Sequence, residues 1–201
     1  MLDVISQLIA ETHGFKHVQR IGDEILTGSG GEALSLADEL FASDVYQARM
    51  CAVHIYGMLS ATHDTAYEAL TQKVVFDRDW RVQEMLAKAF DRYCADIGYE
   101  VAVPVIRAWL SSTNANQRRA ASEGLRIWTS RPYFRDRPDE AITLLAALKA
   151  DESRYVRTSV GNALRDISRA HQELVRAELR LWDTDDPTVL ETHRSASRFI
   201  R

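Results

Sequence analysis

The repeat pattern of this chain is clearest in residues 151–167, DESRYVRTSVGNALRDI. It opens on a polar, acidic turn, continues with a Val-Arg dipeptide, and then repeats apolar residues at spacings of three and four. Small polar and acidic residues cap the first turn of a helix, and this apolar spacing gives the helix one buried face. We therefore expect a helix over residues 153–170, with Arg157 near its start.

Three earlier segments align with this one, and each follows a turn rich in Asp, Asn or Ser. The alignment places four residues in register: Arg49, Gln83, Arg119 and Arg157. Their spacings of 34, 36 and 38 residues are typical of HEAT-like repeats built from two helices.

The composition supports the same architecture, because helix formers dominate and only nine Gly and four Pro are present. The expected helices cover residues 2–12, 15–26, 32–41, 45–60, 65–76, 80–96, 99–111, 116–130, 138–150, 153–170, 172–182 and 187–199. We predict an all-α, HEAT-like repeat α-solenoid of about six helix pairs in a single domain, residues 1–201. Second helices would line a concave groove, where a ligand is expected.

The N-terminal residues, the apolar runs and the two cysteines indicate the cellular compartment. The start carries Asp3 and no basic region, unlike a signal peptide, and no apolar run approaches the roughly 18 residues of a membrane span. Cys51 and Cys94 fall at apolar helix positions, as buried free thiols do in a reducing compartment. We expect a cytoplasmic protein with no membrane partner.

Charge is distributed unevenly along the chain. Residues 1–100 hold 8 Lys+Arg and 16 Asp+Glu, a net −8, whereas residues 101–201 hold 17 and 13, a net +4. Of the 25 cations, 21 are Arg, which binds phosphate or carboxylate through two parallel hydrogen bonds. The basic half predicts an anion-binding face; a high-GC genome that favours Arg codons is the alternative explanation.

Residues 118–134, RRAASEGLRIWTSRPYF, combine several functional side-chain types on one predicted helix and the turn after it. Glu123 and Trp128 fall at positions expected to face the groove, and Asn162 and Asp166 share a face one repeat later because they are four residues apart. Each has a structural alternative: Glu123 pairs with an arginine on its own helix, Trp128 is core, and Asp166 is a solvated acid.

Other chemistries lack their sequence signals. The six His residues show no paired spacing for metal ligands, and neither a Gly-rich phosphate loop nor a Ser or Cys nucleophile motif occurs. We therefore expect no metal and no cofactor.

Two segments resemble a known family. RRAASEG at residues 118–124 and YVRTSVGNALRDI at residues 155–167 are similar to motifs of the bacterial HEAT-like DNA alkylation-repair glycosylases, the AlkC/AlkD superfamily. The resemblance implies excision of cationic N3- or N7-alkylated purines from duplex DNA bound in the groove. It differs most at residues 131–134, Arg-Pro-Tyr-Phe.

The resemblance also implies residue roles. Asp166 would be the catalytic carboxylate, Glu123 a second acid and Trp128 an aromatic wall. The DNA-binding or site-supporting residues would be Arg118, Arg119, Arg126, Arg131, Arg157, Asn162, Arg165 and Arg169. For Arg119 and Arg157 a structural role, bonding the acid of a neighbouring turn, is the alternative.

Three functions remain open at this stage. The first is an alkylpurine DNA glycosylase, and the second is a non-catalytic HEAT-repeat module that binds DNA. The third is a protein-interaction scaffold, favoured by the acidic first half.

Overall fold

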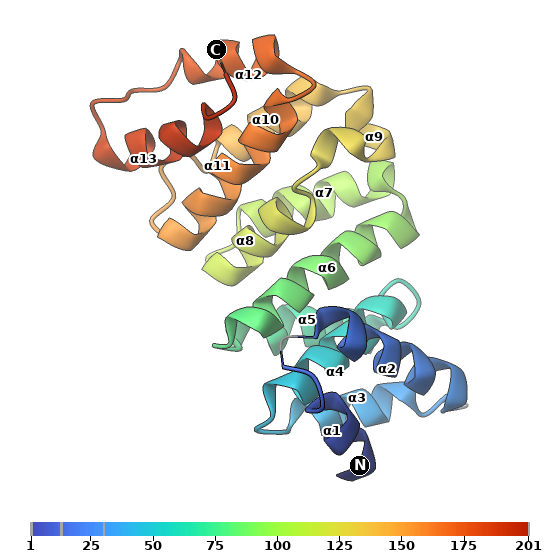
Figure 1. Ribbon diagram of the computed structural model, residues 1–201. Helices are drawn as coiled ribbons and strands as arrows, with labels where there is room; N and C mark the ends of the chain where they lie inside the picture. Colours follow the sequence, from blue (N-terminus) through green and yellow to red (C-terminus); the bar gives the residue numbers. More distant parts are fainter. Residues whose placement is uncertain (1, 13, 30, 201) are drawn as a thin grey trace. The chain divides into compact units, whose positions relative to one another are not determined.

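The computed structural model describes residues 2–12, 14–29 and 31–200. Within these residues the chain forms thirteen α-helices, two 3₁₀-helices and no β-strand (Figure 1). The elements are α1 (Leu2–Leu8), α2 (Phe15–Gly28), α3 (Ala33–Phe41), α4 (Tyr46–Leu59), α5 (Asp64–Gln72), η1 (Val74–Phe76), α6 (Trp80–Ile97), α7 (Tyr99–Leu110), α8 (Ala115–Gly124), η2 (Trp128–Ser130), α9 (Pro132–Arg135), α10 (Pro138–Ala146), α11 (Arg154–Ser168), α12 (Gln172–Leu179) and α13 (Pro187–Ala196). The all-α prediction is confirmed.

The chain divides into two compact units, Met1–Asp96 and Ile97–Arg201. In the first unit, α4 packs against α2, α3 and α5. In the second, α11 lies between α8 and α13 and also contacts α10 and α12 (Figure 1). Helices α4 and α11 are therefore central in their units, and most of their residues are buried.

The same hydrogen-bonded turn precedes the four aligned second helices, α4, α6, α8 and α11. In every case a Ser or Asp side chain accepts a hydrogen bond from the backbone N–H two residues later: Ser43 from Val45 (3.1 Å), Asp77 from Asp79 (2.8 Å), Ser112 from Asn114 (3.1 Å) and Asp151 from Ser153 (2.8 Å). Such local side-chain bonds are why these residue types favour turns and helix starts. The polar turns seen in the sequence are therefore a repeated structural element.

A long side chain six residues later fixes the repeat register. It donates to the carbonyl oxygen of the turn residue: Arg49 to Ser43 (3.0 Å), Gln83 to Asp77 (2.8 Å), Arg118 to Ser112 (2.8 Å) and Arg157 to Asp151 (2.7 Å). Arg118, not Arg119, is thus the equivalent of Arg49, and the predicted register was wrong by one residue in this repeat. Two adjacent arginines carry no pattern that says which of them faces the turn.

These arginines also link consecutive repeats within each unit. Arg49 Nε lies 2.6 Å from Asp77, and Arg118 donates from Nε and Nη2 to Asp151 at 2.7 and 2.8 Å. Arg157 binds Glu191 at 2.6 Å in the same way. The Arg157 and Arg154 hydrogen bonds hold the pKa of Glu191 below its usual value.

The predicted helix over residues 116–130 is wrong in its length, because α8 ends at Gly124. Trp128 is fully buried, with its ring 4.7 Å from that of Phe134, and its indole Nε1 donates to the Ser122 carbonyl at 3.5 Å. Burial of these two rings outweighs helix propensity, and the indole meets a carbonyl of the last turn of α8.

Cys51 and Cys94 are buried free thiols, as predicted. Burial, reinforced by the Asp23 charge, raises the pKa of Cys51 to about 12. In the parts of the chain that the structure describes, we find no helix with the length and apolarity needed to cross a membrane.

Candidate functional site

Five of the sequence-predicted residues form one charged cluster between α8 and α11. They are Glu123, Arg126, Asn162, Arg165 and Asp166. The loop after α8 supplies Arg126, and the last three come from one side of α11. The cluster therefore joins consecutive repeats of the second unit, with Arg126 between Glu123 and Asp166.

Arg126 bridges the two carboxylates. Its Nε lies 2.7 Å from Asp166 Oδ2, and its Nη1 lies 3.2 Å from Glu123 Oε1. Partial burial disfavours the charged form of this guanidinium, but the hydrogen bonds to Asp166 and Glu123 outweigh it and raise the pKa of Arg126. The arginine is therefore positively charged at every physiological pH.

Asp166 is bound on both oxygens. Arg126 contacts Oδ2, while Arg165 donates from Nε and Nη2 to Oδ1 at 3.3 Å each. The Asp166 side chain is 11% exposed, whereas Arg126 is 43% exposed. The Asp166 side chain is thus mostly shielded from solvent, and Arg126 is the more exposed partner.

Asn162 ties the cluster to the C-terminal helix. Its Oδ1 accepts from Arg165 Nη1 at 2.9 Å and from Ser195 Oγ, on α13, at 3.5 Å. The neighbouring Gly161 permits this contact, because a Cβ at that position would lie 2.6 Å from the Ser195 Cβ. Glycine at residue 161 therefore lets α13 approach α11 closely.

Phe199 is a site residue that sequence reasoning missed. The guanidinium carbon of Arg165 lies 5.7 Å from its ring centroid, and that of Arg169 lies 4.8 Å away. An arginine over an aromatic face is held by the negative charge of the ring surface. The only sequence signal was an aromatic residue near the end of the chain, next to Arg198.

Four predicted site residues lie in structural positions instead. Trp128 is core, so its role as an aromatic wall is corrected. Arg118 is buried against Asp151, and Arg157 is held by turn carbonyls and Glu191. Arg119 is also buried, with its guanidinium carbon 4.4 Å from the Tyr155 ring centroid. The expected contact with the acid of a neighbouring turn is made by Arg118, whereas Arg157 binds turn carbonyls and Glu191 of α13 and Arg119 packs beside Tyr155.

The two remaining arginines lie nearer the surface. Arg169 is exposed beside Phe199, and half-buried Arg131 precedes α9 with its guanidinium carbon 6.0 Å from the Tyr99 ring centroid. Among the described residues there is no group of three or more His, Cys, Asp or Glu arranged to hold a metal ion. The chemistry available at the cluster is that of two carboxylates and their arginines.

A comparison with protein families identifies the chain. The model described as DNA alkylation repair enzyme matches residues 16–181. The chain belongs to the DNA alkylation repair enzyme family. Its matched segment includes α8, α11 and every residue of the charged cluster.

Two solved structures share the fold of this chain. AlkD2 from Streptococcus mutans is 45% identical over 99% of this chain and 98% of its own, with a TM-score of 0.93. The alkylpurine DNA glycosylase AlkC from Pseudomonas fluorescens, bound to DNA containing an abasic site analog, is 22% identical over 97% of this chain and 56% of its own, with a TM-score of 0.71. The HEAT-like α-solenoid class predicted from the sequence is confirmed.

A curated relative shares a shorter segment. YhaZ of Bacillus subtilis (strain 168), an uncharacterized protein, is 39% identical over 87 residues, 41% of this chain. The match spans 24% of the length of YhaZ.

Proposed function

We propose that this DNA alkylation repair family member hydrolyses the N-glycosidic bond of cationic N3- or N7-alkylated purines in duplex DNA, acting in the cytoplasm. The observation that carries the proposal is the Glu123–Arg126–Asp166 bridge, in which one arginine joins two carboxylates from consecutive repeats, each of them partly exposed. Family membership and the likeness to AlkD2 support it, and AlkC, described as an alkylpurine DNA glycosylase, shares the fold.

The proposed reaction needs no general acid. An alkylated purine already carries a positive charge, so the bond from C1′ to nitrogen breaks with its electron pair passing to the base, which leaves neutral. The sugar develops oxocarbenium character, as in other glycoside hydrolyses, and water adds to C1′ and loses a proton. Asp166 would stabilise the cationic sugar electrostatically and orient the water, with Glu123 as the second acid.

Arg126 would control the charge of this site. While Arg126 binds Asp166 Oδ2, it neutralises the negative charge of the carboxylate, which is the charge that would stabilise the sugar cation. A phosphate group is a strong bidentate partner for a guanidinium, and Arg126 is the most exposed member of the bridge. In the proposal, DNA phosphates draw Arg126 away, and Asp166 becomes available as the sugar cation forms.

The test of this function is release of 3-methyladenine or 7-methylguanine from methylated duplex DNA by the purified chain. Release above the rate in protein-free buffer supports the proposal, and release at that background rate contradicts it.

A second candidate function is DNA binding without catalysis. The observation in its favour is the burial of Trp128, which leaves the cluster without the aromatic face that the family resemblance implies. Binding of damaged duplex without any release of base would favour this second function over the first.

A further inference from the structure

A cavity of about 280 Å³ in the first unit lies at the same repeat positions as the charged cluster of the second unit. Counting five and nine residues on from Arg157 gives Asn162 and Asp166. The same counts from Arg49 and Gln83 give four residues that line the cavity: His54, Met58, Lys88 and Arg92. The cavity therefore occupies the face of α4 and α6 that corresponds to the functional face of α8 and α11.

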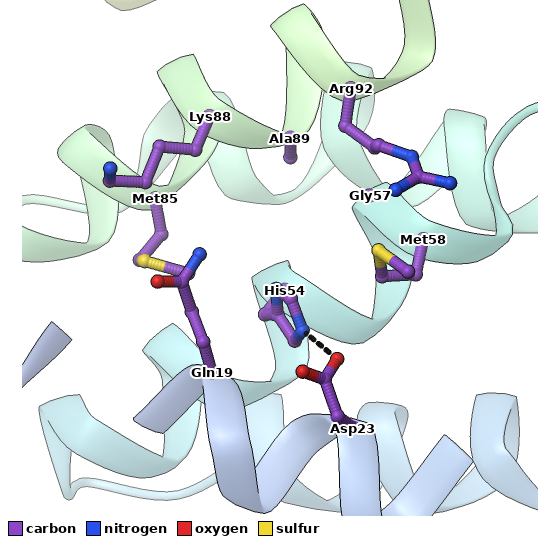
Figure 2. A pocket seen from close by; sticks show the side chains of 9 residues that line it. All are labelled: Gln19, Asp23, His54, Gly57, Met58, Met85, Lys88, Ala89 and Arg92. Atoms are coloured by element: carbon purple, nitrogen blue, oxygen red, sulfur yellow. Dashed lines mark hydrogen bonds and ion pairs between the residues drawn. The ribbon is translucent and has the colours of Figure 1, made fainter. Parts of the chain in front are cut away.

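The polar groups of the cavity are placed by three helices. Figure 2 shows Lys88 and Arg92 extending from α6 toward opposite ends of the cavity, with His54 of α4 and Asp23 of α2 on the facing side. His54 Nε2 lies 2.7 Å from Asp23 Oδ1, which fixes the orientation of the ring. The partly exposed Met58 adds flexible apolar surface, and the buried Met85 packs behind the cavity wall.

Two close helix contacts keep the cavity walls in place. A Cβ at Gly57 would lie 2.7 Å from the Ala89 Cβ, so α4 and α6 meet at a point where only glycine fits. A Cβ at Gly22 would lie 2.6 Å from the Cδ2 of His54, so α2 also approaches closely. The cavity is bordered by packed backbone, which makes it a preformed site.

The cations here differ from the structural arginines of this unit. Arg49 and Arg81 are held by Asp77 and Asp79. Lys88 is exposed and, among the described residues, has no hydrogen-bond or ion-pair partner. Arg92 is 49% exposed and uses Nε for Asp96 at 2.6 Å. Two cations four residues apart on one helix face therefore border a cavity with capacity to bind an anion.

We propose that this cavity is a phosphate site for one nucleotide unit. Lys88 and Arg92 turn inward to bind the phosphate, and Met58 contacts the sugar. The volume suits one such unit, because it falls just below the range of about 300–1,000 Å³ that drug-sized ligands occupy. The source of the phosphate is the DNA backbone if the proposed function holds, on which this part of the inference rests; a free mononucleotide offers the same chemistry.

The experiment measures affinity for an undamaged duplex as a function of salt, with Lys88→Gln, Arg92→Gln and the double variant. The double variant is expected to weaken binding severalfold at low salt and to reduce the slope of log K against log salt by about 0.9, the value for one phosphate contact, and each single change should reduce both by less. Lys73→Gln is the matched control, since Lys73 is an equally accessible lysine of the first unit that pairs with Asp38 away from this cavity. It should leave the slope unchanged, and melting curves check that each variant folds.

A second arm uses deoxyadenosine monophosphate in calorimetry. If Lys88→Gln loses affinity for the nucleotide but not for the duplex, the phosphate site is supported and its ligand is a free nucleotide. Equal affinity of the parent and the double variant for both ligands, including no binding of either, overturns the inference. Base release is scored separately: a parent that binds through Lys88 and releases no base fails as a glycosylase while the phosphate site stands.

Discussion

Arg126 Nε lies 2.7 Å from Asp166 Oδ2, and this contact joins the loop after α8 to α11 in the next repeat. In the free protein it gives the candidate catalytic carboxylate a positive partner. The same guanidinium is exposed enough to meet a phosphate. Whether Arg126 exchanges the carboxylate for DNA is therefore open to direct measurement.

Replacing Arg126 with Gln should weaken duplex binding severalfold and lower the salt slope by about 0.9, because one phosphate contact is lost. Fluorescence anisotropy over a salt series provides the measurement. Arg154→Gln is the control, since Arg154 is 80% exposed and pairs with Glu191 outside the cluster. Indistinguishable slopes for the parent and Arg126→Gln would show that Arg126 stays on Asp166 when DNA binds.

The Arg118–Asp151 pair should be a main support of the second unit. Both side chains are buried, and two hydrogen bonds of 2.7 and 2.8 Å join them. Arg118→Met leaves the Asp151 carboxylate buried without this partner, which typically costs about 3–5 kcal/mol of the free energy of unfolding. Urea denaturation measures the loss; the exposed pair in Arg154→Ala should contribute about 0–1 kcal/mol. A similar small loss for both variants would refute the supporting role of Arg118.

Burial of Trp128 predicts a stability effect. Trp128→Ala removes a fully buried indole packed on Phe134 and should lower the free energy of unfolding by about 3–5 kcal/mol. Trp80→Ala is the comparison, because half of the Trp80 side chain is exposed and a clearly smaller loss is expected. If Trp128→Ala unfolds with the same free energy as the parent, Trp128 is not a core residue, and the role at the groove surface expected from the sequence is favoured.

Ionisation of Asp186 should make the free energy of unfolding depend on pH in the acidic range. Its side chain caps α13 by accepting from the Thr188 and Val189 backbone N–H groups, and the Thr188 hydrogen bond leads in lowering its pKa. The pKa of Asp186 is lower in the folded than in the unfolded protein. Its ionised side chain therefore stabilises the fold at pH values above the unfolded pKa of about 3.9, and this stabilisation is lost as the pH falls through the folded pKa. Asp186→Asn keeps the cap without the titration.

The thermal midpoint of the parent should therefore fall more steeply than that of Asp186→Asn as pH is lowered from about 5 to about 2. Calorimetry at several pH values makes the comparison. Parallel curves for the two proteins would rule out a contribution from Asp186 ionisation.

The sequence predicted the parts of the structure that repeat. Polar turns followed by apolar spacing located the helix pairs, and Glu123 and Asp166 were placed at groove-facing positions of consecutive repeats. Trp128 was expected to face the groove because the predicted helix continued through residue 128. In the structure its ring is buried against Phe134 and lies outside the regular helix. Arg118 and Arg119 are adjacent and alike, so only contacts with a particular turn distinguish them. Phe199 joins the site through tertiary packing of the C-terminal segment, which no local pattern encodes.

The central claim is that Asp166 provides the carboxylate for base release. The most direct measurement is single-turnover release of 7-methylguanine from methylated duplex by the parent and by Asp166→Asn, with Asp136→Asn, an exposed acid of the same unit, as control. Loss of a preorganised electrostatic group should slow release about 10²-fold or more, while duplex affinity stays equal or rises because a negative charge is removed. Equal release by the parent and Asp166→Asn, or no release by the parent, would contradict the account.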